Sequence, residues 1–223
     1  MKTLVIAPHP DDETLGVGGT ILKRISKKNK VAWLIVTNIP QTKKNKKIIS
    51  EYENIILKVK NAYKFEKVYK LNLSNSKLDT LQLKTLIDMF SKIFKSFKPN
   101  EIFIPHPIDA HTDHKIIFEA VSATTKVFRY PYIKKILSYE TLSETGYGLT
   151  SQKDKKNFFP NYYVNISKFL KKKINIARIY KKEFKKHPFP RSILAIKSLA
   201  RIRGAESNNK FAEAFELLRN IED

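Results

Sequence analysis

Short apolar runs alternate with longer amphipathic segments along the first 130 residues of the chain. The short runs are rich in β-branched residues and predict strands. The longer segments repeat apolar residues at the spacing of a helix with one buried face. The predicted strands are 3–7, 31–36, 68–73 and 101–105, and the predicted helices are 13–27, 47–62, 81–97 and 113–127. This alternation favours right-handed βαβ units, so we expect a Rossmann-like α/β fold, with a mostly parallel sheet covered by helices on both faces.

The pattern is looser after Arg129. We expect strands at 133–139 and 162–166, a loop at 146–161, and helices at 167–185 and 192–203, separated by the turn His187-Pro188-Phe189-Pro190. The segment 211–218 is compatible with either a strand or a helix. Because the sequence contains no repeat or linker, we expect one domain over 1–223. In it, a parallel α/β core (1–130) carries a C-terminal elaboration (131–223) that shapes the substrate pocket.

The composition is that of a globular protein, with 42% hydrophobic and 11% aromatic residues in a chain of 223. The absence of cysteine excludes a disulfide framework, a thiolate metal site and a cysteine nucleophile, and it fits a reducing compartment. The first apolar run is too short for a signal peptide, and no run approaches the ~20 residues that a membrane-spanning helix needs. We therefore expect a soluble, cytoplasmic protein without a membrane span.

The formal net charge of +22 has two interpretations. A strongly basic protein is attracted to polyanions, such as nucleic acid or an anionic membrane surface. However, only seven of the 43 basic residues are Arg, which is the better residue for bidentate phosphate recognition, and lysines are distributed along the predicted helices. The sequence thus favours a solvated basic surface and predicts no specific nucleic-acid partner, while association with a membrane surface stays open.

Four of the five histidines fall in two short polar clusters, each directly after a predicted strand. The first cluster is His9-Pro10-Asp11-Asp12-Glu13, and the second extends from His106 to His114 with the sequence His-Pro-Ile-Asp-Ala-His-Thr-Asp-His. In open α/β sheets, ligands bind in the crevice beyond the carboxyl ends of the strands. The two clusters are therefore expected to meet there.

Imidazole and carboxylate side chains in this arrangement are typical of a hydrolytic metal site. Such sites use three protein ligands and leave one position open for water. His9 and Asp12 can supply two ligands and a histidine of the second cluster the third, while the adjacent Asp11 can accept the proton of the water. An imidazolium near the developing oxyanion, held by a further carboxylate, would complete the site.

Each cluster alone has a plainer explanation. Asp11 or Asp12 could cap the helix that begins near Glu13, and a His-x-x-His pair at a helix start is often a surface or packing feature. The metal hypothesis depends on the two clusters occurring together, at the ends of two strands of one predicted sheet.

The first cluster, followed by Gly16, Gly18 and Gly19, resembles the signature of the LmbE/PIG-L superfamily of metal-dependent N-acetylglucosaminyl deacetylases. The run Asp-Ala-His-Thr-Asp-His at 109–114 is similar to the second motif of that family, in which Pro more commonly stands at the position of Thr112. The resemblance covers the first 120 residues or so and continues more weakly to 212–215.

The resemblance implies a division of roles within the two clusters. His9, Asp12 and His114 would bind Zn²⁺ or a similar divalent ion, and Asp11 would be the general base. His111 would stabilise the oxyanion, with Asp113 orienting it. The implied activity is removal of an N-acetyl group from an N-acetylglucosamine-type sugar or sugar conjugate. The alternatives are hydrolysis of another sugar-linked amide, such as a mycothiol- or bacillithiol-type conjugate, and a catalytically silent polyanion-binding α/β protein.

Three further residues are candidates for substrate binding, namely His106, Arg191 and Arg203. Each is just as compatible with a structural or surface role. The run Gly16-Val17-Gly18-Gly19 does not have the G-x-G-x-x-G spacing of a dinucleotide site, so we expect it to serve helix–sheet packing or access to the metal. The sugar acceptor, the metal and the oligomeric state are not specified by the sequence.

Overall fold

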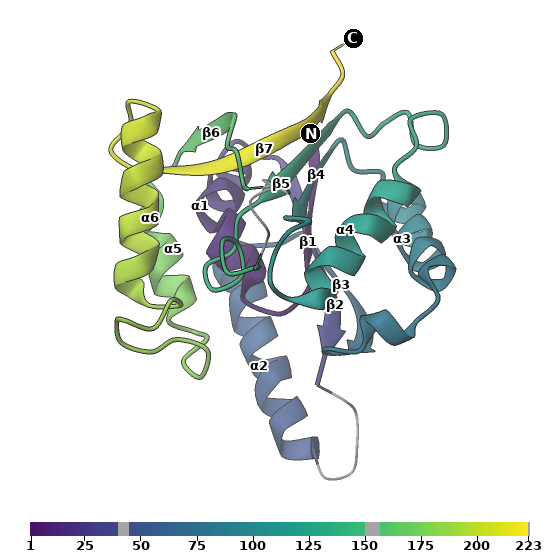
Figure 1. Ribbon diagram of the computed structural model, residues 1–223, viewed down its shortest axis with the longest axis horizontal. Helices are drawn as coiled ribbons and strands as arrows, with labels where there is room; N and C mark the ends of the chain where they lie inside the picture. Colours follow the sequence, from purple (N-terminus) through teal and green to yellow (C-terminus); the bar gives the residue numbers. More distant parts are fainter. Residues whose placement is uncertain (40–44, 150–156, 223) are drawn as a thin grey trace.

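The computed structural model describes residues 1–39, 45–149 and 157–222, and it contains one seven-stranded sheet with the strand order β3-β2-β1-β4-β5-β7-β6 (Figure 1). The strands are β1 (Lys2–Ala7), β2 (Lys30–Asn38), β3 (Lys67–Ser74), β4 (Glu101–Pro105), β5 (Lys135–Tyr139), β6 (Tyr162–Asn165) and β7 (Ala212–Asn220). The helices are α1 (Asp12–Ser26), α2 (Lys46–Tyr63), α3 (Leu83–Phe97), α4 (Thr112–Thr124), α5 (Leu170–Ala177) and α6 (Ile193–Glu206). The neighbouring pairs among β1 to β5 are parallel, and β7 is antiparallel to both of its neighbours. The predicted mostly parallel α/β fold is confirmed.

Helices cover both faces of the sheet (Figure 1). The side chains of β2 alternate between the two faces: Trp33 packs in one apolar cluster with residues of α1, α2, α5 and α6, whereas Leu34 packs in another with residues of α3 and α4. Because each strand of the centre is buried on both sides, its sequence is almost continuously apolar, which is why the core strands could be predicted. Among the described residues, no helix is long and apolar enough to cross a membrane.

The strand order reverses between β1 and β4. From β1 the chain crosses through α1 to β2 and on to β3 in one direction, and from β3 it returns through α3 to β4 on the other side of β1. A switch of this kind opens a crevice at the carboxyl ends of the two central strands. The first histidine cluster follows β1 and the second follows β4, so the topology brings both clusters to this crevice.

The C-terminal part differs from the prediction in one element. The sequence predicts a single helix over 167–185, but α5 ends at Ala177 and the following residues form turns. This departure from the helix buries the side chain of Tyr180, which is 2% exposed, so a long-range contact overrides the local helix pattern. The ambiguous segment 211–218 belongs to strand β7. Of the predicted loop 146–161, residues 150–156 lie outside the described residues, and the remainder contains no helix or strand.

Helix α1 lies unusually close to the C-terminal strands. A Cβ atom at Gly16 would lie 2.3 Å from Cδ2 of Tyr139 on β5, and one at Gly19 would lie 2.6 Å from Cγ2 of Ile166. The backbone N–H groups of Gly19 and Thr20 donate to the carboxylate of Glu213 on β7, each at 2.7 Å. The glycines of the first motif therefore serve close helix–sheet packing, one of the two roles expected for them.

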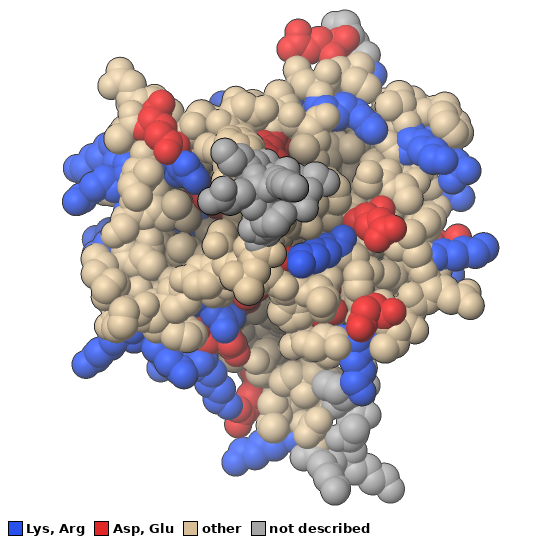
Figure 2. Space-filling model, in the orientation of Figure 1, with Lys and Arg blue, Asp and Glu red and all other residues tan. Residues whose placement is uncertain are grey.

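Positive charge is concentrated in one part of the chain. Between 168 and 191 there are ten Lys and Arg residues and a single acidic residue, Glu183. Figure 2 shows basic side chains along the lower left edge of the molecule, where Figure 1 places the connection between α5 and α6. Any electrostatic attraction of polyanions is expected to be strongest at this edge.

A buried ion pair ties α1 to β4. The guanidinium of Arg24 donates two hydrogen bonds of 2.8 Å to the carboxylate of Glu101, and both side chains are at most 10% exposed. We expect Glu101→Gln to lower the free energy of unfolding by about 3–5 kcal/mol, because it leaves the guanidinium charge buried without its partner. Urea unfolding measures the loss. The control is Asp88→Asn, which removes one partner of an exposed pair with Lys84. Equal losses in the two variants would contradict the prediction.

Candidate metal centre and active site

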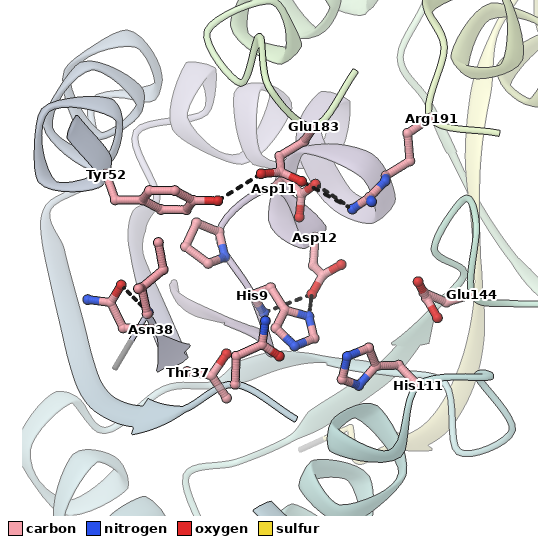
Figure 3. Close-up of a pocket in the computed structure, with 13 residues that line it drawn as sticks. His9, Asp11, Asp12, Thr37, Asn38, Tyr52, His111, Glu144, Glu183 and Arg191 are labelled. Carbon is pink, nitrogen blue, oxygen red and sulfur yellow. Dashed lines mark hydrogen bonds and ion pairs between the residues drawn. The ribbon is translucent and has the colours of Figure 1, made fainter. Parts of the chain in front are cut away.

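A cavity of about 210 Å³ lies outside the carboxyl ends of β1 and β2 (Figure 3). Residues of the first cluster form its floor, and His111 and Glu144 stand on one side of it. The opposite wall is built by α2 and by the connection between α5 and α6. The residues that line the cavity are His9, Pro10, Asp11, Asp12, Thr37, Asn38, Ile39, Tyr52, Asn75, His111, Glu144, Glu183 and Arg191.

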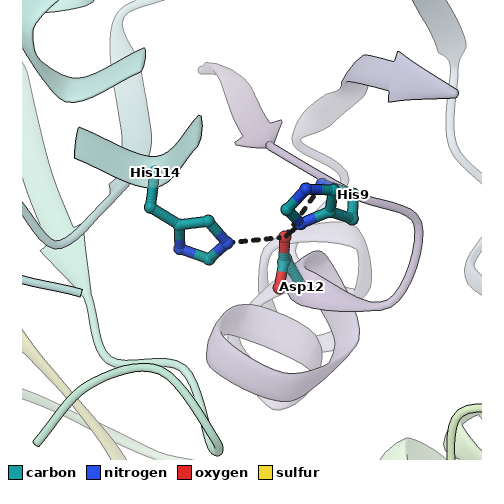
Figure 4. Close-up of side chains that lie close together, drawn as sticks. All are labelled: His9, Asp12 and His114. Carbon is teal, nitrogen blue, oxygen red and sulfur yellow. Dashed lines mark hydrogen bonds and ion pairs between the residues drawn. The ribbon is translucent and has the colours of Figure 1, made fainter. Parts of the chain in front are cut away.

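The three predicted metal ligands converge at this cavity (Figure 4). Asp12 Oδ2 lies 3.2 Å from His9 Nδ1 and 3.3 Å from His114 Nε2, and the three donor atoms all lie within 4.8 Å of one another. His9 comes from the turn after β1, Asp12 begins α1, and His114 lies in the first turn of α4. Two imidazoles and one carboxylate, converging from separate elements, form a donor set that suits Zn²⁺ or a similar divalent ion.

Asp109 fixes the tautomer of His114. Its Oδ2 lies 2.7 Å from His114 Nδ1, and both side chains are fully buried. This contact places the ring proton on Nδ1 and leaves the lone pair of Nε2 directed at the donor set. Among the described residues, Nε2 has no hydrogen-bond partner of good geometry, although Asp12 Oδ2 is close. A buried imidazole nitrogen that faces a carboxylate of the donor set, with a second carboxylate bound to the other ring nitrogen, is the arrangement expected of a metal ligand.

Asp109 begins the second motif, but the sequence assigns it no role, and its contact with His114 gives a test. We expect Asp109→Asn to weaken metal binding by about 10- to 100-fold, because the amide donates to Nδ1 and moves the ring proton to Nε2. Competition with a chelator measures the affinity. The control is Thr145→Val, which removes the hydroxyl that donates to Asp109 Oδ1 but leaves the carboxylate in place. An affinity for metal unchanged by Asp109→Asn would show that the carboxylate does not set the tautomer.

Without a metal, the charges of the donor set are balanced by protons. Burial opposes the charged form of His9, but hydrogen bonds to Asp113 and Asp12 outweigh it and raise the pKa of His9 to about 9. Burial also opposes the charged form of His114, but the charge of Asp12 and the hydrogen bonds to Asp109 and Asp12 together outweigh it and raise the pKa of His114 to about 10. Burial would raise the pKa of Asp12, but the two imidazoles hold it well below its usual range. A bound cation would replace one proton of each imidazolium, the one on the coordinating nitrogen, and His114 would keep the proton on Nδ1.

Asp11 lies beside the donor set but is not part of it. Its side chain is buried and lines the cavity, and Arg191 Nη1 lies 3.3 Å from its Oδ2 (Figure 3). Burial and the neighbouring charge of Asp12 raise the pKa of Asp11 well above its usual value, against the opposing charge of Arg191. A carboxylate with a raised pKa, next to a metal site and free of the metal, is suited to accept a proton near neutral pH.

His111 lines the cavity, and its ring centroid lies 4.4 Å from that of His9. It precedes α4 and caps that helix, because its Nδ1 accepts the backbone N–H of Asp113 at 3.1 Å. In the neutral ring, the proton is therefore on Nε2. Burial and the charge of His9 lower the pKa of His111. This imidazole is thus a neutral hydrogen-bond donor at the edge of the cavity.

The carboxylate of Asp113 lies nearer to His9 than to His111. Its Oδ2 is 3.2 Å from His9 Nε2 and 3.9 Å from His111 Nδ1, and the carboxylate also accepts the backbone N–H groups of Ser76 and Leu78. Its most direct contact therefore orients His9, and it reaches His111 chiefly through the backbone. His9, His111 and Asp113 form a second group of potential donors that shares His9 with the first.

The three candidate substrate-binding residues are not brought together. Arg191 lines the cavity beside Asp11. His106 and Arg203 instead line a second cavity of about 260 Å³, in which Glu216 lies 3.2 Å from His106 and Arg203 makes two hydrogen bonds to Glu140. Both residues are therefore held by carboxylates away from the donor set.

Several cavity residues carry no motif in the sequence. Tyr52 projects from α2, and its hydroxyl donates to Glu183 at 2.7 Å (Figure 3). Glu144 follows β5 and lines the cavity on the same side as His111. The sequence places Tyr52 on the inner face of a predicted helix, but it does not indicate that this face ends at a cavity. These polar groups can donate to and accept hydrogen bonds from a hydroxylated ligand.

The fold and the site together define a class: an α/β protein with a His/Asp donor set at the switch point of its sheet and an unligated carboxylate beside it. Residues 4–125 match the family model PIG-L, described as GlcNAc-PI de-N-acetylase, so the chain belongs to that family. The expected resemblance is confirmed.

Individual relatives align over nearly the whole chain. The diacetylchitobiose deacetylase of Thermococcus kodakarensis is 23% identical over 235 residues, which cover 99% of this chain and 84% of that protein. The conserved protein TT1542 from Thermus thermophilus has a TM-score of 0.78 at 20% identity, covering 99% of this chain and 96% of the other. The N,N'-diacetylchitobiose deacetylase from Pyrococcus horikoshii, solved with an inhibitor, has a TM-score of 0.73 at 20% identity, covering 98% and 84%. At these identities the structural likeness shows the fold.

Proposed function

We propose that this protein is a metal-dependent amide hydrolase that removes the N-acetyl group from an N-acetylglucosamine-type sugar or sugar conjugate. The observation that carries the proposal is the convergence of His9, Asp12 and His114, with Asp11 beside them but outside the donor set. Three ligands and a separate base are what hydrolysis by a metal-activated water requires. Membership of a family described as a de-N-acetylase and the deacetylase names of two relatives support the reaction type.

The reaction can be written with the residues of this chain. A divalent ion in the donor set would polarise the amide carbonyl and lower the pKa of a water molecule toward about 7. Asp11 accepts a proton from the water whose oxygen adds to the acetyl carbon. The Nε2–H group of His111 donates a hydrogen bond to the oxyanion that develops on the carbonyl oxygen. When the carbon–nitrogen bond breaks, the proton held by Asp11 passes to the leaving nitrogen, and the products are a free amine and acetic acid, which ionises to acetate.

The walls of the cavity favour a neutral, hydroxylated group over an anionic one. Besides Asp11 and Asp12, the lining includes the carboxylates Glu144 and Glu183, and Arg191 is its one guanidinium among the described residues. Neutral donors and acceptors come from Tyr52, Asn38 and Asn75, among others. We propose that they bind the hydroxyls of a sugar ring. The ion would be Zn²⁺ or another divalent metal, and we propose that the protein acts in the cytoplasm.

The proposal is tested by acetate release from a panel of amides. The panel contains N-acetylglucosamine, its nucleotide and lipid conjugates, chito-oligosaccharides, and mycothiol- and bacillithiol-type conjugates, each with the metal-loaded protein. Release of acetate from an N-acetylated amino sugar is expected, and it must fall when the metal is removed with a chelator. Cleavage of only a different sugar-linked amide would support the alternative amidase. No hydrolysis of any member would overturn the proposal.

A catalytically silent, polyanion-binding protein is the second candidate, and the concentration of basic residues between 168 and 191 is the observation in its favour. Binding of this type weakens steeply as the salt concentration rises from ~50 to ~200 mM. Such salt-sensitive binding of nucleic acid or anionic vesicles, together with an absence of hydrolysis, would favour this candidate.

A further inference from the structure

Asp11 has a backbone conformation that L-amino acids rarely adopt, with φ 121° and ψ −28°. A residue stays in such a conformation only where surrounding contacts hold it there, and such residues concentrate at functional sites. The backbone carbonyl of Asp11 accepts the N–H groups of Thr14 and Leu15 and so begins the hydrogen bonding of α1. This conformation is therefore part of the turn that places Asp11 beside the cavity and Asp12 in the donor set.

Glu13 binds the backbone of Asp11 on the N–H side. Its Oε2 accepts the backbone N–H of Asp11 at 3.1 Å, and its Oε1 accepts the hydroxyl of Thr14. The Glu13 side chain is completely buried and does not line the cavity. Its donors are a backbone amide and hydroxyl groups, none of them charged. Burying a carboxylate among neutral donors is unfavourable compared with capping a helix at the surface, so the arrangement needs an explanation beyond helix capping.

Tyr180 supplies a further hydrogen bond to Glu13. Its hydroxyl donates to Glu13 Oε1 at 2.7 Å, and its ring is buried. Tyr180 follows α5 directly, at the point where the chain leaves the helix predicted for 167–185. Arg191, from the same connection between α5 and α6, approaches the carboxylate of Asp11. One segment of the C-terminal part thus reaches Asp11 from two directions: the backbone through Tyr180 and Glu13, and the carboxylate through Arg191.

We propose that Glu13 and Tyr180 are positioning residues for Asp11, holding its peptide in the strained conformation that directs its carboxylate at the reacting water. This inference rests on the proposed function of Asp11 and adds to it a role for a buried tyrosine of the C-terminal part. The link is mechanical: Tyr180 orients Glu13, and Glu13 binds the Asp11 N–H. Neither residue lines the cavity.

Tyr180→Phe tests the proposal, because it removes only the hydroxyl. With the N-acetylated sugar that the wild-type protein deacetylates fastest, kcat is expected to fall about 10- to 100-fold, the range for outer-shell partners and for a misplacement of about 1 Å. KM and the metal content should change little. The matched control is Tyr130→Phe, which removes the hydroxyl of another buried tyrosine. Tyr130 belongs to the apolar cluster on the other face of the sheet, and its hydroxyl is hydrogen-bonded to Ser91. A kcat equal to that of the control, or a loss accounted for by lost metal, would overturn the proposal.

Variants at Glu13 provide a readout that does not depend on activity. In crystal structures, Glu13→Ala is expected to release the Asp11 peptide from its positive φ and to move the carboxylate. Glu13→Gln keeps an acceptor for the Asp11 N–H and should preserve the conformation. An unchanged Asp11 in Glu13→Ala would overturn the positioning role even if the wild-type protein hydrolyses none of the tested amides, which separates this failure from that of the proposed function. If Glu13→Ala does not fold, the crystal structure of Tyr180→Phe takes its place, and an Asp11 with unchanged backbone and carboxylate positions in that variant would overturn the proposal.

Discussion

Asp11→Asn is expected to lower the rate of acetate release by about 10²- to 10⁴-fold, the usual contribution of a general base, while the chain keeps its metal. The amide has nearly the same size as the carboxylate but cannot accept the proton of the water. Because Asp11 is not in the donor set of His9, Asp12 and His114, the affinity for the ion should be preserved. Acetate release and metal content measured on the same preparation give both quantities.

The matched control is Glu183→Gln, which neutralises another carboxylate of the same cavity. Glu183 also lies near Arg191, at 3.8 Å, so this variant separates the loss of a partner for the guanidinium from the loss of the base. We expect its effect to fall mainly on KM, because Glu183 orients Tyr52 in the cavity wall. If Asp11→Asn and Glu183→Gln reduce kcat to the same extent, or if Asp11→Asn loses its metal, Asp11 is not the base.

The central part of the fold can be predicted because its pattern is local. The sequence predicts β4 with the bounds Glu101–Pro105 that the structure has, since a strand buried on both faces is almost continuously apolar, as at Ile102-Phe103-Ile104, and polar residues delimit the apolar run. The two polar clusters follow such strands, so their meeting at one edge of a parallel sheet can be inferred without knowing the strand order. The structure adds the reversal between β1 and β4, which opens the crevice where they meet.

Other parts of the site depend on side-chain contacts that the hydrophobic pattern does not predict. Asp109 begins the second motif, but the sequence assigns it no role, and the role becomes apparent only from its oxygen 2.7 Å from His114 Nδ1. Tyr180 lies in a lysine-rich stretch with helical spacing, but in the structure α5 ends at Ala177 and Tyr180 is bonded to Glu13, 167 residues earlier in the chain. The sequence pattern does not pair these residues: Glu13 and His114 belong to the two polar clusters, but nothing in the pattern says which side chain each of them contacts.

Arg203 is a second case in which the sequence does not determine the contacts of a side chain. In the sequence, Arg191 and Arg203 are equal candidates for reaching the substrate. The bidentate contact with Glu140, at 2.8 and 2.7 Å, holds Arg203 in the second cavity, whereas the connection before α6 brings Arg191 to Asp11. A helical segment predicted with correct type and approximate bounds does not determine which of its ends faces the crevice. That is set by how the helix packs on the rest of the molecule.

His114→Ala is expected to remove the ion, and with it hydrolysis. The fully buried Nε2 of His114 is one of three donor atoms, so its loss should weaken metal binding by more than the 10- to 100-fold typical of an outer-shell partner. His9→Ala should have the same effect. Purified protein is expected to contain about one divalent ion per chain, as three-ligand sites do. Elemental analysis after dialysis measures the metal, and acetate release measures the activity.

Two further histidine variants decide which donor set holds the ion. His9 belongs to both groups of potential donors, whereas His114 belongs only to the first and His111 only to the second. If the ion is bound by His9, Asp12 and His114, His111→Ala should keep its metal and lose activity through the missing hydrogen bond to the oxyanion. His106→Ala, at a buried histidine outside both groups, controls for the loss of any imidazole. Metal retained in His114→Ala but lost in His111→Ala would transfer the site to the second donor group, and Asp12 would then be free to act as the base.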